Sequence, residues 1–100
     1  MVTRIALVDD EASVRVALSR VLRLAGYEVG AYASGKDFLA AIDDFRPDCA
    51  LLDIHMPGLT GLQVQHQLQA QHAQVPAVLI TASEDADMRV RVHDAGGFCL

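Results

Sequence analysis

The chain has 100 residues, 52% hydrophobic and 21% charged, which predicts one small domain with its own core and excludes a disordered or low-complexity segment. Its formal net charge of -5 disfavours direct contact with nucleic acid, because phosphate binding needs clustered Lys and Arg side chains. The longest apolar run, residues 38–42, is too short for a membrane-spanning helix, and the first residues lack the pattern of a signal peptide.

Apolar runs alternate with helical patterns from the start of the chain. Residues 5–8 form the first run, and apolar side chains then recur with helical spacing over residues 14–25. This pattern predicts a strand followed by a helix that buries one stripe. A weaker run at residues 27–32 predicts a second strand, and Ser34 is a suitable N-cap for a helix that ends before Pro47.

The second half of the chain repeats this alternation. Residues 49–52 and 77–80 are apolar at consecutive positions, which is typical of strands covered on both faces. Residues 60–73 fit a helix less clearly, and the six glutamines from Gln63 to Gln74 predict a polar face for it. Residues 84–95 fit a helix that a Gly pair ends, and a fifth strand begins at Phe98. The order predicts an α/β fold with a parallel sheet and helices on both faces.

The two cysteines, Cys49 and Cys99, both lie within apolar runs. Buried free thiols are the usual state of cysteine in a reducing compartment. Together with the absence of a leader or spanning pattern, this predicts a cytoplasmic protein that does not contact a membrane.

Acidic and hydroxyl side chains follow three of the predicted strands. Asp9 and Asp10, followed by Glu11, come after the first strand, Asp53 ends the third, and Thr81 follows the fourth. The carboxyl ends of parallel strands share one edge of the sheet, where ligands bind in such folds. Converging carboxylates repel one another, and Mg²⁺ prefers hard oxygen ligands of this kind. The pattern therefore predicts a Mg²⁺ site.

A simpler interpretation exists for part of this group. On their own, Asp9, Asp10 and Glu11 are equally consistent with acidic caps at the start of the first helix. Thr81 on its own is most simply a β-branched strand residue. The placement of Asp53 and Thr81 at matching strand ends favours a site over these separate explanations.

Four short motifs, in this order and spacing, resemble the receiver domain of two-component response regulators. The motifs are Val8-Asp9-Asp10-Glu11, Asp53-x-x-Met56-Pro57-Gly58-x-x-Gly61, Ile80-Thr81-Ala82 and Ala95-Gly96-Gly97. The resemblance implies one receiver domain over residues 1–100, with a doubly wound, flavodoxin- and CheY-like parallel sheet in the strand order 2-1-3-4-5. The Met-Pro-Gly portion resembles receivers that precede a helix-turn-helix output domain, which implies a role in transcription regulation.

The resemblance also implies residue roles. Asp53 matches the phosphoacceptor, whose carboxylate takes a phosphoryl group from a histidine of a sensor kinase. Asp9, Asp10, Asp53 and the backbone carbonyl of His55 match the ligands of Mg²⁺. A protein of this kind is not an enzyme in the turnover sense, since it promotes only its own phosphorylation and dephosphorylation.

The remaining positions match residues that, in this family, change conformation on phosphorylation or set the lifetime of the acyl phosphate. Thr81 matches the hydroxyl that turns toward the phosphoryl group, and the small Ala82 leaves room for this movement. His55 and Ser83 match positions that influence how fast water attacks the acyl phosphate.

The sequence departs from the family pattern in one respect. Receivers have a lysine at the end of the fifth strand, and the matching position falls shortly beyond Leu100. Lys36 is the only lysine in the chain and cannot replace it by spacing. We therefore expect a truncated receiver with an incomplete fifth strand and no last helix. Its exposed strand edges predict association as a homodimer or a swapped dimer.

Three other functions compete with this one. A degenerate receiver that serves only as an interaction module, without phosphorylation, is the main alternative. A hydrolase with an aspartate nucleophile needs a second acid two residues later within hydrophobic flanks, and neither residues 9–11 nor residues 53–55 supply this pattern well. A dinucleotide-binding fold is disfavoured, because no G-x-G-x-x-G follows the first strand.

Overall fold

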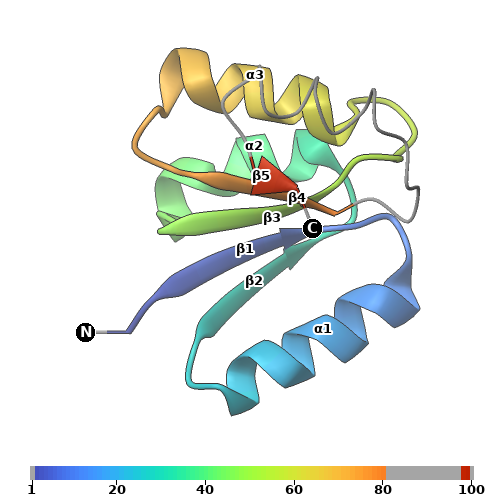
Figure 1. Cartoon of the computed structure of the whole chain (residues 1–100), viewed down its shortest axis with the longest axis vertical. Coiled ribbons are helices and arrows are strands. Elements are labelled where there is room, and N and C mark those ends of the chain that lie inside the picture. The colour runs from blue at the N-terminus through green and yellow to red at the C-terminus, as the bar shows by residue number, and fades with distance from the viewer. Residues whose placement is uncertain (1, 81–97, 100) are drawn as a thin grey trace.

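The computed structural model describes residues 2–80 and 98–99 of the chain. Within these residues, strands and helices alternate around one parallel sheet (Figure 1). The elements are β1 (Arg4–Val8), α1 (Ala12–Leu24), β2 (Glu28–Tyr32), α2 (Gly35–Phe45), β3 (Cys49–Asp53), α3 (Gly61–Gln71), β4 (Ala77–Ile80) and β5 (Phe98–Cys99).

All strand pairs are parallel, and the sheet has the order β2-β1-β3-β4-β5. This confirms the predicted doubly wound α/β fold and its strand order. The register pairs Val8 of β1 with Leu52 of β3, so the next residues, Asp9 and Asp53, leave the sheet at the same edge. Ile80 of β4 pairs with Asp53 itself. The sheet register alone therefore brings these three chain segments to one place.

The main core lies between the sheet and the helices α2 and α3, which cover one face (Figure 1). Phe38 of α2 and Leu68 of α3 are fully buried there, against Leu52 and Leu79 of the sheet. These strand residues alternate with half-buried ones, because consecutive side chains of a strand point to opposite faces. The packed face holds the carboxyl ends of β1 and β3 in fixed positions.

The predicted buried stripe of α1 is wrong in detail. Leu18 and Leu22 are half-buried, Val21 is 61% exposed, and Ser19 is the buried residue of this helix. The reason is the position of α1, which lies alone among the described helices on its face of the sheet and packs mainly against the edge strand β2 (Figure 1). Leu51 and Val78, which point to the sheet face opposite the main core, are likewise only half-buried.

Helix α3 resolves the ambiguous region around residues 60–73. Thr60 and Gln63 form a capping box, in which the Thr60 hydroxyl accepts from the Gln63 N–H and the Gln63 side chain accepts from the Thr60 N–H. The prediction that the glutamines form a polar face is wrong at Gln65, which is 1% exposed. Gln65 lies one turn from both Gly61 and Leu68, so it shares their buried face.

Ser34 is the N-cap of α2, as predicted, and its side chain accepts a hydrogen bond from the Asp37 N–H. The helix predicted over residues 84–95 lies outside the described residues. Strand β5 is described over two residues, which pair with Val78 and Leu79 of β4. No helix in the described ranges has the length and apolar character needed to cross a bilayer.

Candidate functional site

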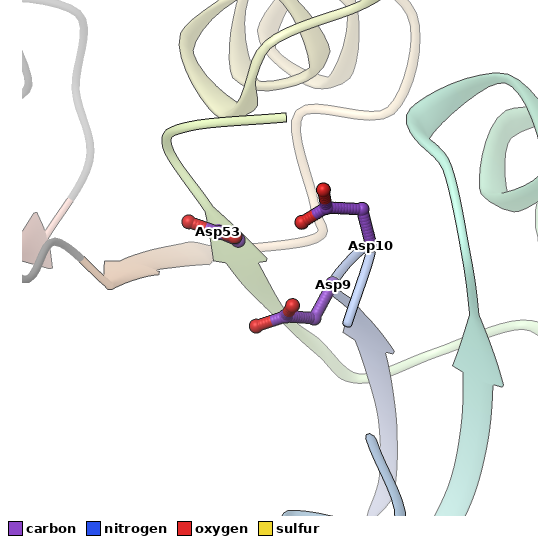
Figure 2. Close-up of side chains that lie close together, drawn as sticks. All are labelled: Asp9, Asp10 and Asp53. Atoms are coloured by element: carbon purple, nitrogen blue, oxygen red, sulfur yellow. The ribbon is translucent and has the colours of Figure 1, made fainter. Parts of the chain in front are cut away.

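The carboxylates of Asp9, Asp10 and Asp53 meet at the carboxyl edge of the sheet (Figure 2). One oxygen from each lies within 4.8 Å of an oxygen from the others. Asp9 and Asp10 follow β1, and Asp53 is the last residue of β3. We refer to these three residues as the acidic trio. Glu11 is not part of it.

Asp9 is held by hydrogen bonds from three sides. Its N–H donates to the Tyr32 carbonyl (3.1 Å), its Oδ1 accepts from the Glu11 N–H (2.9 Å), and its carbonyl accepts from Arg15 Nη1 (2.8 Å). Its side chain is buried, whereas Asp10 is exposed. This arrangement gives one rigid carboxylate and one that can adjust.

The capping interpretation of these acids is not supported by the geometry. Helix α1 begins after Glu11, and the Glu11 side chain makes no hydrogen bond to the helix N–H groups. The Asp9 carboxylate bonds to the N–H of Glu11, which precedes the helix. The acids therefore belong to the edge of the sheet rather than to the start of α1.

Asp53 is half-buried, and its Oδ1 accepts a hydrogen bond from the His55 N–H (3.1 Å). The chain then turns through Gly58, which has a positive φ of 77°, and returns so closely that a methyl group at Gly61 would overlap the Asp53 carbonyl oxygen. The Gly61 N–H also donates to the Ile54 carbonyl (3.2 Å). The first residue of α3 therefore fixes the backbone on which the Asp53 carboxylate is mounted.

The three negative charges of the acidic trio repel one another when no positive charge lies beside them. Burial raises the pKa of Asp53, and the negative charges of Asp9 and Asp10 raise it further, while the hydrogen bond from the His55 N–H opposes the shift. In the described part of the chain, no Lys or Arg forms an ion pair with these acids. A divalent cation would relieve this repulsion. Three carboxylates, one of them open to solvent, suit Mg²⁺, which retains several waters.

The other predicted site residues are less completely described. His55 is exposed, and its backbone N–H donates to Asp53 Oδ1. The charge of its imidazole also acts to lower the pKa of Asp53. Thr81, Ala82 and Ser83 lie outside the described residues. The preceding Ile80 accepts a hydrogen bond at its carbonyl from the Ile54 N–H (3.1 Å), so β4 ends beside the acidic trio.

Two residues that support the site were not assigned a role from the sequence. Gly61 belongs to the quoted motif, and its spacing from Asp53 was the available signal. Arg15 gave no such signal, because an arginine on a helix surface is usually solvated and its bond to the Asp9 carbonyl depends on the path of the chain.

Comparison with known proteins shows which family the chain resembles. The sequence profile of the response regulator receiver domain matches residues 5–99. The DNA-binding transcriptional regulator NtrC of Salmonella typhimurium is 37% identical over 92% of this chain, and the transcriptional regulatory protein PrrA of Mycobacterium tuberculosis is 39% identical over 93%. The chain spans only 20% of NtrC and 40% of PrrA.

Solved structures agree in fold. Chemotaxis protein CheY4 of Vibrio cholerae superposes with a TM-score of 0.90 at 28% identity, covering 99% of this chain and 84% of that one. A response regulator from Chloroflexus aurantiacus has the same TM-score at 30% identity and covers 99% and 83%. With a profile match over nearly the whole sequence and this fold, the chain belongs to the response regulator receiver domain family.

Proposed function

We propose that residues 1–100 act as a receiver that takes a phosphoryl group from a phosphohistidine of a sensor kinase onto Asp53. The convergence of the acidic trio at one sheet edge is the observation that carries this proposal. Asp53 is the member best suited to attack, because it lies at a strand end with one oxygen held by the His55 N–H and the other without a hydrogen bond among the described residues.

Asp9, Asp10, Asp53 and the His55 carbonyl are the proposed Mg²⁺ ligands. Bound Mg²⁺ would neutralise charge on the equatorial phosphoryl oxygens, which is the main requirement of this reaction. An Asp53 carboxylate oxygen then bonds to phosphorus, and the P–N bond to the kinase imidazole breaks. The imidazole keeps the bonding electrons and takes a proton from solvent. The product is an acyl phosphate. Its later hydrolysis restores the Asp53 carboxylate and releases inorganic phosphate.

The downstream roles follow from the family. Thr81 and Ala82 are proposed to sense the phosphoryl group, and His55 and Ser83 to set its lifetime. Because NtrC and PrrA are transcriptional regulators, we propose that the whole protein controls transcription from the cytoplasm through a DNA-binding output domain. Contact with the kinase and pairing of two copies are the proposed protein interactions.

Phosphorylation is tested with a small phosphoryl donor and Mg²⁺, read out by intact mass. The wild-type chain is expected to gain a phosphoryl group poorly in the absence of the family lysine and well when it is extended beyond that position, and D53N is expected to gain none. D10N should need a much higher Mg²⁺ concentration for the same labelling. D43N removes an exposed acid of α2 and should behave as wild type. Labelling of D53N would show that another residue accepts the phosphoryl group and would contradict the role of Asp53. No labelling of the wild-type chain extended beyond Leu100 would favour the interaction-only module.

A further inference from the structure

A groove lies between α1 and β2. Its volume is about 570 Å³, within the range of about 300–1,000 Å³ found for small-molecule sites. The residues that line it are Arg15, Val16, Ser19, Arg20, Arg23, Leu24 and Ala31. We call it the arginine groove. The acidic trio does not line it, so it is a separate feature of the domain.

The groove is a concentrated positive region on an acidic chain. Helix α1 has three arginines and no acid, whereas the whole chain has a net charge of -5. Arg15 and Arg23 donate to the backbone carbonyls of Asp9 and Val29, and Arg20 forms no hydrogen bond or ion pair within the described residues. The ion pair found in that part of the chain joins Arg4 to Glu28. The three guanidinium charges are therefore not neutralised by a carboxylate.

Ser19 gives an independent sign of an unfilled site. It is 5% exposed, and its hydroxyl has no hydrogen-bond partner, although it lines the groove. Buried hydroxyls are normally paired, because an unpaired one loses its bonds to water without replacement. A rotation of the Ser19 hydroxyl toward the groove would let a ligand oxygen accept this hydrogen bond. Its charge would be balanced by guanidinium groups, which bind carboxylates and phosphates in a bidentate manner.

The walls of the groove suit an apolar group. Val16 is 60% exposed and Leu24 is 83% exposed, and both are large aliphatic side chains beside the arginines. Inorganic phosphate alone would leave these side chains in water. A ligand with an oxyanion head and an apolar body would cover them and occupy the charged end as well.

We propose that the arginine groove binds an amphipathic organic anion, with a phosphate, phosphonate or carboxylate head and a small apolar body. Arg20 is the residue free to bind the head, and Ser19 donates to it. Val16 and Leu24 contact the apolar body. This site is distinct from the proposed phosphoryl chemistry at Asp53 and does not depend on it.

The test uses phenylphosphonate as the probe, added to the ¹⁵N-labelled chain in Mg²⁺-free buffer and followed by NMR. Backbone amides of Ser19, Arg20 and Ala31 are expected to shift and saturate. Inorganic phosphate offers an oxyanion head without a ring, and benzyl alcohol offers a ring without the anion, so each should bind at least about tenfold more weakly. Equal affinity for inorganic phosphate, or shifts confined to the acidic trio, would overturn the proposal.

Variants distinguish specific binding in the arginine groove from general attraction of the anion to positive charge. R20Q should weaken phenylphosphonate binding about tenfold, the effect of losing one charge-assisted hydrogen bond. K36Q removes the same charge from an exposed position of α2 and should leave the affinity unchanged. S19A should also weaken binding while its NMR spectrum remains that of the folded chain. An equal loss in K36Q, or wild-type affinity in both R20Q and S19A, would show that the groove is not the site.

Discussion

Asp53 has to meet two opposing requirements. It must be ionised to attack phosphorus, yet its partial burial and the neighbouring Asp9 and Asp10 favour the protonated form and raise its pKa. The hydrogen bond from the His55 N–H favours the charged form and partly offsets this. The residue is therefore kept reactive at a cost to the stability of the metal-free fold.

The cost to stability gives a pH-dependent prediction. Because the folded-state pKa of Asp53 is raised above its ordinary value of 3.8, the unfolded chain loses this proton more readily, and ionisation of Asp53 lowers the free energy of unfolding as pH rises. D53N should therefore be more stable than wild type at neutral pH without Mg²⁺, and the gain should shrink as pH falls toward 3.8. Urea unfolding at several pH values measures this difference.

The control for this prediction is D43N, which removes an exposed negative charge from α2, away from the acidic trio. It should not reproduce the gain of D53N. A metal-free D53N that is less stable than wild type at neutral pH would contradict the predicted repulsion.

Gly61 gives a second residue-scale prediction. A side chain at this position overlaps the Asp53 carbonyl oxygen, which belongs to the backbone and cannot rotate away. G61A should lower the free energy of unfolding by about 1–3 kcal/mol, as overpacking does, and should slow phosphorylation of Asp53. Q67A, on the exposed side of the same helix, should change stability by less than about 0.5 kcal/mol. Wild-type labelling of a folded G61A would show that the close approach does not position Asp53.

At the scale of elements, helix α3 joins the loop after Asp53 to the core. Its start is fixed by the capping box of Thr60 and Gln63, and its buried face by Val64 and Leu68. The cap satisfies N–H groups that would otherwise lack partners at the helix start. The loop that carries His55 is thus anchored at one end by β3 and at the other by α3.

Loss of this cap has a measurable cost. T60A should lower the free energy of unfolding by about 1 kcal/mol, because the hydroxyl no longer accepts from the Gln63 N–H. T60S keeps an acceptor at the same position and should recover most of the loss. Chemical denaturation of the three proteins measures the effect, and equal losses in T60A and T60S would assign it to the Thr60 methyl group rather than to the cap.

At the scale of the whole molecule, the acidic trio exists only in the folded chain. Its members come from β1 and β3, which are separated by α1, β2 and α2 and meet through the sheet register. A cation that binds all three therefore binds the native state in preference to the unfolded one. Metal binding and folding are expected to be coupled.

This coupling predicts stabilisation by Mg²⁺. At a concentration 100 times its Kd, Mg²⁺ should raise the free energy of unfolding by about 2.7 kcal/mol and raise the Tm accordingly. D10N should lose most of this gain at the same concentration, whereas D43N should retain it. Thermal unfolding across a Mg²⁺ titration measures both, and a Tm of the wild-type chain that does not respond to Mg²⁺ would argue against a metal site.

The sequence was least informative where burial depends on neighbouring elements. Helical spacing correctly located α1, yet its apolar stripe is partly exposed because α1 lies over the edge strand β2. Gln65 was expected in water and is buried, because the position of α3 places one glutamine on the packed face. Periodicity reports which side chains share a face but not how far a neighbour covers that face.

The sequence by itself determined the alternation of strands and helices, the parallel sheet and the identity of the acids at the strand ends, because these follow from apolar periodicity and from the position of each acid after its strand. Only the tertiary structure decided that Asp9, Asp10 and Asp53 lie within 4.8 Å while Glu11 is left out, and that Gly61 and Arg15 brace them. Those contacts join residues distant in the chain, and their geometry is set by strand register and helix placement, which no local pattern encodes.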